Sequence, residues 1–256
     1  MPIPNTMHVA IWLLALALTP PVSAAEPSPD RLLAEGRADA AIASLQNKLS
    51  GTPSDAQAHN LLCRAYLMAG NWDAGIAACQ KAVSLEPGNS HYHLWLGRIY
   101  GEKADRANFL SAASLAGKVR NEFEAAVRLD PKNMEARSDL ADFYLEAPGI
   151  VGGGKDKAEA QAQQMASLDP AGANLLRAKL AEKRDDFVEA EKQYRAAIQA
   201  SGGKAGTWLS LAQFYRRRER FDPMEDAIQH VVSAERGQHV LLAAADFLVR
   251  IKRDLP

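Results

Sequence analysis

Apolar residues recur along the chain in pairs of short segments, and the pairs repeat at a step of 34 residues between Pro53 and Pro87. Within this unit Leu62 and Tyr66 share one face of a first helix, and a Gly-Asn turn at Gly70 leads into a second amphipathic segment. Spacing of three and four residues is typical of helices that bury one face. A self-similar unit of this length predicts a stack of helical hairpins.

The same pattern predicts an all-α fold for most of the chain. Alanine is abundant and aromatic residues make up only 7% of the sequence, which suits closely packed helices better than a sheet. With 47% hydrophobic residues the chain can bury a sizeable core. We expect about five to six hairpins, over residues 30–53, 56–89, 90–132, 133–170, 171–204 and 205–236, and a C-terminal capping helix at 237–256.

Two hairpins depart from the 34-residue step. Pro131 follows Pro87 by 44 residues, and the surplus lies at 101–117, where Ala, Ser and Leu predict a longer helix or an added turn. The second surplus, at 147–154, contains Pro148 and four glycines, which cannot continue a helix. We expect a hairpin loop there, and its length makes it a possible partner contact.

The first 25 residues differ in composition from the rest. An apolar run at 9–18 precedes Pro20, Pro21 and the small residues that end at Ala24 and Ala25. This order is typical of a secretory signal peptide cleaved after Ala24 or Ala25, although no Lys or Arg precedes the apolar run. We therefore expect a periplasmic or secreted protein, and the alternative is an uncleaved N-terminal membrane anchor.

Small residues occupy matching places in successive hairpins. Over residues 30–236 the pattern resembles the tetratricopeptide repeat (TPR) family, in which such residues let helices approach closely. The resemblance implies a right-handed superhelical stack whose first helices form a concave wall that binds an extended peptide or a partner's helix. The matching small residues are Cys63, Gly97, Ala141, Ala178 and Ala212 on first helices, and Ala82, Ala126 and Ala197 on second helices.

The resemblance also identifies candidate groove residues on the first helices. Chaperone-binding members of the family hold a C-terminal carboxylate with Lys and Asn side chains, but here Trp95, Glu135 and Asp139 stand at such places, so we do not expect that ligand. The residues expected to line the groove are Asn60, Arg64, Met68, Leu94, Arg98, Glu102, Ser138, Asp142, Glu146, Lys179, Lys183, Gln213, Arg216 and Arg217.

Cys63 and Cys79, the two cysteines of the chain, each lie eight residues from Asn71 at the centre of a hairpin turn. In an antiparallel hairpin they face each other, and export would favour a disulfide. The alternative is a pair of buried thiols. A metal site that adds His59 and His93 lacks the usual ligand spacing, and we expect none.

Other features favour neither catalysis nor nucleic-acid binding. The net charge of −1 gives no general attraction to polyanions. The segment 149–156 is similar to a phosphate-binding loop, but Asp156 replaces the hydroxyl residue and a helix is expected where a strand is needed. We expect a non-enzymatic scaffold with no cofactor, metal or small-molecule substrate. The alternatives are an accessory subunit that docks through its C-terminal helix and, more weakly, a metal-handling or hydrolytic protein.

Overall fold

The computed structural model describes residues 27–234, which form twelve α-helices and one short 3-10 helix, with no strand in this range. The helices pair into six antiparallel hairpins, and in each pair we call the earlier one the first helix. The hairpins are α1 (Pro29–Ala34) with α2 (Ala38–Gly51), α3 (Ala56–Met68) with α4 (Trp72–Leu85), α5 (Ser90–Ala104) with α6 (Phe109–Leu129), α7 (Met134–Glu146) with α8 (Lys155–Met165), α9 (Pro170–Glu182) with α10 (Phe187–Ala200), and α11 (Ala205–Arg217) with α12 (Phe221–Ala234).

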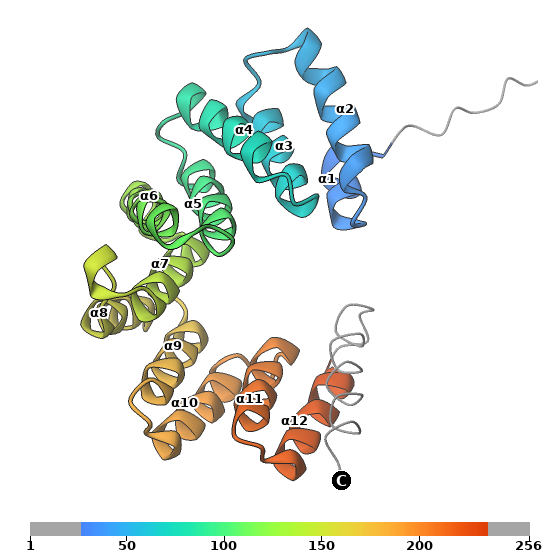
Figure 1. Ribbon diagram of the computed structural model, residues 1–256. Coiled ribbons are helices and arrows are strands. Elements are labelled where there is room, and N and C mark those ends of the chain that lie inside the picture. Colours follow the sequence, from blue (N-terminus) through green and yellow to red (C-terminus); the bar gives the residue numbers. More distant parts are fainter. Residues whose placement is uncertain (1–26, 235–256) are drawn as a thin grey trace, which may run out of the picture.

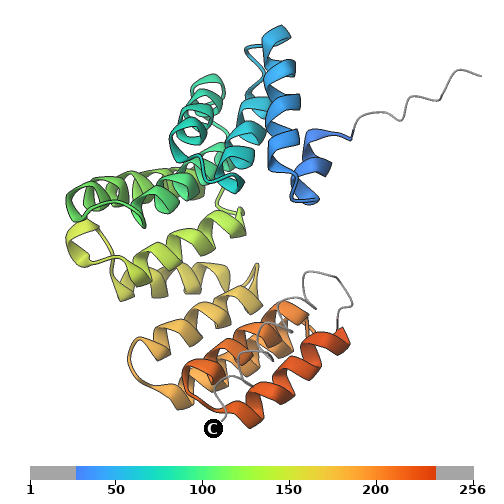
Figure 2. The same cartoon turned by 45° about the vertical axis from the view of Figure 1, so that its right-hand side comes forward.

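The hairpins stack into a curved solenoid. Figure 1 shows an open arc in which α5, α7 and α9 lie on the inner side and α6, α8 and α10 on the outer side. The turned view in Figure 2 shows the helices of successive hairpins packed in layers along the arc. Each hairpin contacts the next one along the chain, so the core is a continuous row of small interfaces. This arrangement confirms the predicted all-α helical solenoid.

Helices approach most closely where the sequence has its small residues. At Gly97 an added Cβ would lie 2.5 Å from the Phe123 ring, so α5 can pack on α6 only because this position has no side chain. The other small residues of the repeat are completely enclosed. Cys63, Ala82, Ala126, Ala141, Ala178, Ala197 and Ala212 are each 0% exposed.

Each of three successive repeats uses one polar side chain to hold the turn that precedes it. The donor stands six residues after the proline that separates two hairpins, and the acceptor is the carbonyl oxygen of that proline. The pairs are His59 Nε2 with Pro53 O at 3.0 Å, His93 Nε2 with Pro87 O at 3.0 Å, and Arg137 Nη2 with Pro131 O at 2.9 Å.

The two surplus segments have different structures. The first lengthens α6 to 21 residues, against 14 in α4, as the sequence predicts. The second forms a loop with the 3-10 helix η1 (Gly149–Val151) before α8 begins. Gly153 packs against the end of α7, where an added Cβ would lie 1.8 Å from Ala147 O. Any larger residue there would displace the loop from α7.

Two predicted elements lie outside the described residues: the signal peptide or membrane anchor at 1–25 and the C-terminal helix at 237–256. Among residues 27–234 no helix combines the length and the apolar character that crossing a bilayer requires.

Candidate partner-binding groove

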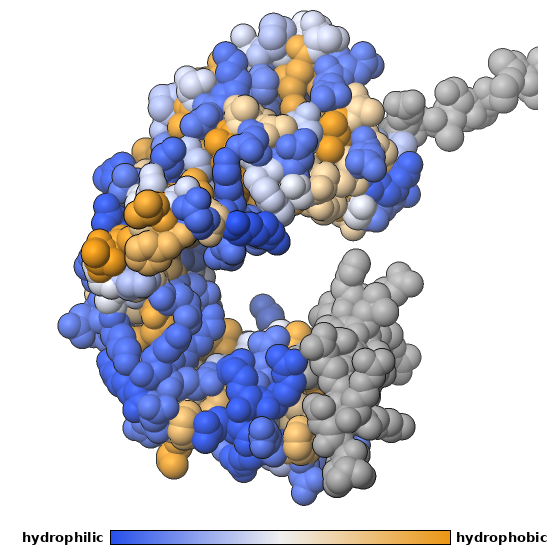
Figure 3. All heavy atoms as spheres, viewed as in Figure 1, coloured by the Kyte–Doolittle hydropathy of each residue, from blue (hydrophilic) through white to orange (hydrophobic). Residues whose placement is uncertain are grey.

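The inner wall of the arc contains a hollow of about 700 Å³ between the first helices α7, α9 and α11, which we call the groove pocket. In Figure 3 the concave side of the arc is visible as an open space bordered mainly by polar surface. The floor of the groove pocket is apolar and its rim is charged. Ala141, Met165, Leu175, Leu176 and Tyr194 contribute to the floor.

Ion pairs along the rim join each first helix to the next one. The side chains of the Asp142 and Glu146 pairs are close to half exposed or more, so each of these two pairs contributes at most about 1 kcal/mol to stability. The pairs nevertheless place both signs of charge around the apolar floor. They are Asp142 with Lys179 at 2.7 Å, Glu146 with Lys183 at 2.6 Å, and Glu182 with Arg217 at 2.7 Å.

Glu182 also fixes the aromatic side chain beneath it. Tyr194 Oη donates a hydrogen bond to Glu182 Oε1 at 2.6 Å. Burial and this hydrogen bond to a carboxylate raise the pKa of the Tyr194 hydroxyl far above its usual range. Tyr194 is therefore a neutral donor at physiological pH, and its ring is a fixed part of the floor.

A second cluster lies on the inner wall towards the N-terminus, around Trp95 of α5. The guanidinium carbons of Arg64 and Arg98 lie 4.8 and 4.7 Å from the indole centroid, within cation–π range. Arg98 Nε also donates to Asp139 Oδ2 of α7 at 2.6 Å. Trp95 thus contacts two cations from successive first helices. The sequence pattern does not predict it as a groove residue.

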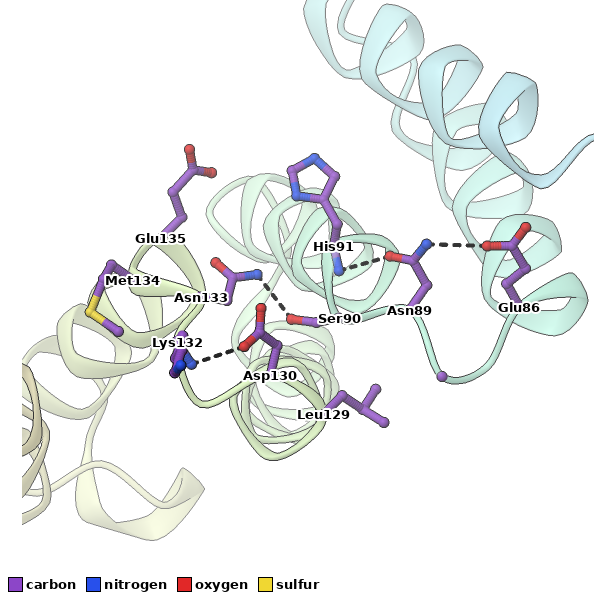
Figure 4. A pocket seen from close by; sticks show the side chains of 11 residues that line it. Glu86, Asn89, Ser90, His91, Leu129, Asp130, Lys132, Asn133, Met134 and Glu135 are labelled. Atoms are coloured by element: carbon purple, nitrogen blue, oxygen red, sulfur yellow. Dashed lines mark hydrogen bonds between the residues drawn. The ribbon is translucent and has the colours of Figure 1, made fainter. Parts of the chain in front are cut away.

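A larger hollow of about 810 Å³ lies at the edge of the solenoid, between the α4–α5 and α6–α7 loops (Figure 4). Its polar groups mainly bond the loops and helix ends to one another: Asn133 Nδ2 donates to Ser90 Oγ at 2.9 Å, and Ser90 Oγ donates to Ala126 O at 2.8 Å. In Figure 4 His91 and Glu135 project away from these bonds. We place the candidate site in the groove pocket, because charged side chains there surround an apolar floor that a ligand could contact.

Half of the predicted groove residues meet around the groove pocket. Four others lie elsewhere on first helices: Arg64 and Arg98 at Trp95, Glu102 paired with Arg106, and Met68, which is exposed. Arg216 is exposed but does not line the groove pocket. The seven that line it are Ser138, Asp142, Glu146, Lys179, Lys183, Gln213 and Arg217.

The prediction was wrong for Asn60 and Leu94, which are 3% and 0% exposed. They occupy one position of the 34-residue step, and α3 and α5 contact each other directly. The side chain at this repeat position of α3 and α5 is therefore covered by neighbouring helices and cannot line the groove. The matching residue after the first insertion is Ser138, which is half-buried and lines the groove pocket.

The cysteines lie opposite each other on α3 and α4. Cys63 and Cys79 form a disulfide, with their Cα atoms 5.2 Å apart. His59 faces the Pro53 carbonyl, so these residues do not assemble a metal site. Within the described part of the chain no group of three His, Cys, Asp or Glu residues is arranged to hold a metal ion.

The glycine-rich segment at 149–156 lacks the geometry of a phosphate-binding loop. It follows the helix α7 and not a strand, and η1 lies within it. Lys155, which would contact phosphate, instead donates to the Lys183 carbonyl oxygen at 2.5 Å.

Part of the chain and its fold are similar to those of known proteins. Residues 32–99 match the family model described as tetratricopeptide repeat. These residues contain tetratricopeptide repeats, and the described solenoid as a whole has the TPR fold. Solved structures similar to it include a thermophilic TPR protein from Thermus thermophilus, with a TM-score of 0.61 and 21% identity over 73% of this chain and 95% of that chain.

Two further structures show the same fold. MamA has a TM-score of 0.53 and 20% identity, covering 70% of this chain and 96% of its own. A TPR protein from Parabacteroides merdae has a TM-score of 0.59 and 14% identity, covering 88% of this chain and 84% of its own. A comparison with curated protein sequences finds no match. The TPR fold is in general a scaffold for protein–protein interaction, and this is the class of function that it supports here.

Proposed function

We propose that this TPR protein is a non-enzymatic scaffold that binds an extended peptide or a partner's helix in the groove pocket. The observation that supports this most directly is the combination of an apolar floor with charges of both signs on three successive first helices. Such a surface suits a segment that inserts apolar side chains and carries flanking charges.

The charges on the rim also limit which partners fit. Each carboxylate already has a cation from the next helix, so a partner of one sign must displace an internal pair. A partner that alternates acidic and basic residues can bond with both members without leaving a charge unpaired. We therefore infer a ligand of mixed charge, in contrast to the C-terminal carboxylate bound by the chaperone-type clamp.

We further propose that the protein acts outside the cytoplasm, where it aids the assembly of an envelope complex. The apolar N-terminal run and the Cys63–Cys79 disulfide support export. Mass spectrometry of the mature protein tests it: export with cleavage predicts an N-terminus at Ala25 or Glu26. An intact N-terminus in a cytoplasmic fraction would contradict this proposal.

Filling the groove pocket tests the binding proposal. Gln213 is half-buried and lines the groove pocket, so Gln213→Trp places a bulky ring in it. Gln199 is exposed on the second helix α10, and Gln199→Trp is the matched control. Calorimetric titration with the affinity-captured partner should show affinity reduced by roughly tenfold or more for Gln213→Trp alone. Equal affinity of the two variants would exclude the groove pocket as the site.

A further inference from the structure

The two segments that depart from the 34-residue step come together in space. The end of α5, the start of α6 and the loop between α7 and α8 enclose a hollow of about 400 Å³, which we call the insertion pocket. Its walls are predominantly apolar, and residues from both segments contribute to them. They include Phe109, Ala112, Ala116, Val119, Phe143 and Ile150.

Large apolar side chains at this place are open to solvent. Ile150 is 92% exposed, Phe109 84% and Leu110, its neighbour in the chain, 79%. These are three of the four most exposed large apolar side chains among residues 27–234. In Figure 3 orange side chains gather on the left of the molecule, over α6 and η1. A concentration of exposed apolar surface beside a hollow is a mark of an interaction site.

The charged side chains that line the insertion pocket are both acidic. Asp105 and Glu146 are its charged lining residues, and Glu146 is paired with Lys183 of the groove rim. Asp105 caps the end of α5, and its carboxylate has no hydrogen bond or ion pair with another described residue. The nearby cations Lys103 and Arg106 are bonded to carboxylates outside the insertion pocket, and Arg120 donates to the Val151 carbonyl oxygen and lies near Glu124. Helices α5 and α7 end here and α6 begins here, so helix ends of both signs meet at the insertion pocket and the acidic character comes from the Asp105 carboxylate.

We propose that the insertion pocket binds a short segment of a partner protein in which large aliphatic or aromatic side chains adjoin a Lys or Arg. The apolar side chains would cover Phe109 and Ile150, and the cation would pair with Asp105. A volume of about 400 Å³ lies within the usual range for ligand pockets, roughly 300 to 1,000 Å³. This site is separate from the groove pocket, although Glu146 lines both.

Charge distinguishes this occupant from two others. A fatty acid would bring its carboxylate towards the Asp105 carboxylate and be repelled. A second copy related by a two-fold axis would place the same acidic patch against itself, because such an interface is self-complementary. A basic, apolar segment meets neither difficulty and gains both apolar burial and an ion pair.

A random 12-residue peptide display library selected on the full-length protein tests the proposal. The recovered peptides are titrated against the double variant Phe109→Ser/Ile150→Ser and against Asp105→Asn. These changes are at exposed positions, so the fold is retained. Val188→Ser is the matched control, because Val188 is 83% exposed on the distant helix α10.

The proposal predicts peptides that combine Leu, Ile, Phe or Trp with an adjacent Lys or Arg. Their affinity should fall roughly tenfold or more in the double variant, as expected for losing an apolar anchor, and severalfold in Asp105→Asn, but not in Val188→Ser. Gln213→Trp should leave it unchanged, which separates this site from the groove pocket. The proposal would be overturned if none of the recovered peptides lost affinity in the double variant. It would also be overturned if the protein formed a dimer that Ile150→Ser dissociates.

Discussion

Tyr144 Oη on α7 donates a hydrogen bond to Glu124 Oε1 on α6 at 2.8 Å, across the junction between two hairpins. The residues are 20 positions apart. The same spacing joins Gln46 to Tyr66 and Gln80 to Tyr100 in the two preceding junctions, each at 2.9 Å. The third hairpin is longer than the second, yet its junction is unchanged, because its extra residues lie at the other end of α6.

This junction predicts a graded loss of stability. Tyr144→Phe removes a bond to a carboxylate and should lower the free energy of unfolding by about 1 to 2 kcal/mol, because a charged acceptor strengthens the bond. Tyr66→Phe removes an exposed bond to a neutral amide and should cost less, at most about 0.5 kcal/mol. Urea denaturation measures both. A larger loss in Tyr66→Phe would show that these tyrosine bonds do not stabilise the junctions in this way.

Much of the fold follows from the sequence because the packing residues repeat. The step of 34 residues, the glycine at position 97 and the prolines between hairpins indicated helices and turns that the structure contains. The sequence predicts that Cys63 and Cys79 lie opposite each other, because a short turn fixes the register of two antiparallel helices.

The groove was harder to predict because the repeat fixes which residues lie on the concave side but not which of them are covered. Leu94 and Ser138 share one repeat position, yet Leu94 is enclosed and Ser138 is accessible. The repeat pattern does not identify Trp95, because its role depends on two arginines from separate helices. The insertion pocket depends on two segments about 40 residues apart in the chain, and neither forms it alone.

A close contact between helices gives the second prediction. Gly97→Ala places a methyl group 2.5 Å from the Phe123 ring and should destabilise the protein by about 1 to 3 kcal/mol, because the ring must move within a packed core. Gly117 is also helical, but a Cβ added there would meet no other atom within 4 Å. Gly117→Ala is therefore the control and should stabilise by up to about 1 kcal/mol. Thermal and urea unfolding measure both. Similar effects of the two changes would contradict the packing of α5 on α6.

The disulfide gives a third prediction. Closing a loop with a sequence separation of 16 should contribute about 3 kcal/mol, mainly by restricting the unfolded chain. The variant Cys63→Ala/Cys79→Ala should therefore unfold at a lower urea concentration than the oxidised protein, and reduction of the wild type should have a similar effect. Mass spectrometry after alkylation without reduction provides the direct check. Two alkylated thiols in the mature protein would show that the bond does not form.

His93 gives a prediction for pH. Its Nδ1 lies 2.6 Å from Glu122 Oε2, and this hydrogen bond raises the pKa of His93 above its ordinary value of 6.5. Because the folded state favours the protonated ring, the stabilisation is complete below pH 6.5 and is lost as the pH rises through the raised pKa. NMR titration of the ring should show the elevated pKa, and stability should fall on the alkaline side.

Glu122→Gln is the control for this effect, since it removes the carboxylate and keeps the side-chain shape. The pKa of His93 should fall in this variant, and the part of the alkaline loss of stability that His93 causes should become smaller. An unchanged pKa of His93 in Glu122→Gln would contradict the assignment of the shift to this pair.

The central claim is that a partner binds in the groove pocket, and site-specific photo-crosslinking tests it most directly. A photoreactive phenylalanine analogue is introduced at Gln213 inside the groove pocket or at Gln199 on the outer helix α10, in separate samples from the native compartment. We predict one dominant crosslinked partner from position 213 and none from position 199. The same partner crosslinked from position 199 but not from 213 would contradict the claim.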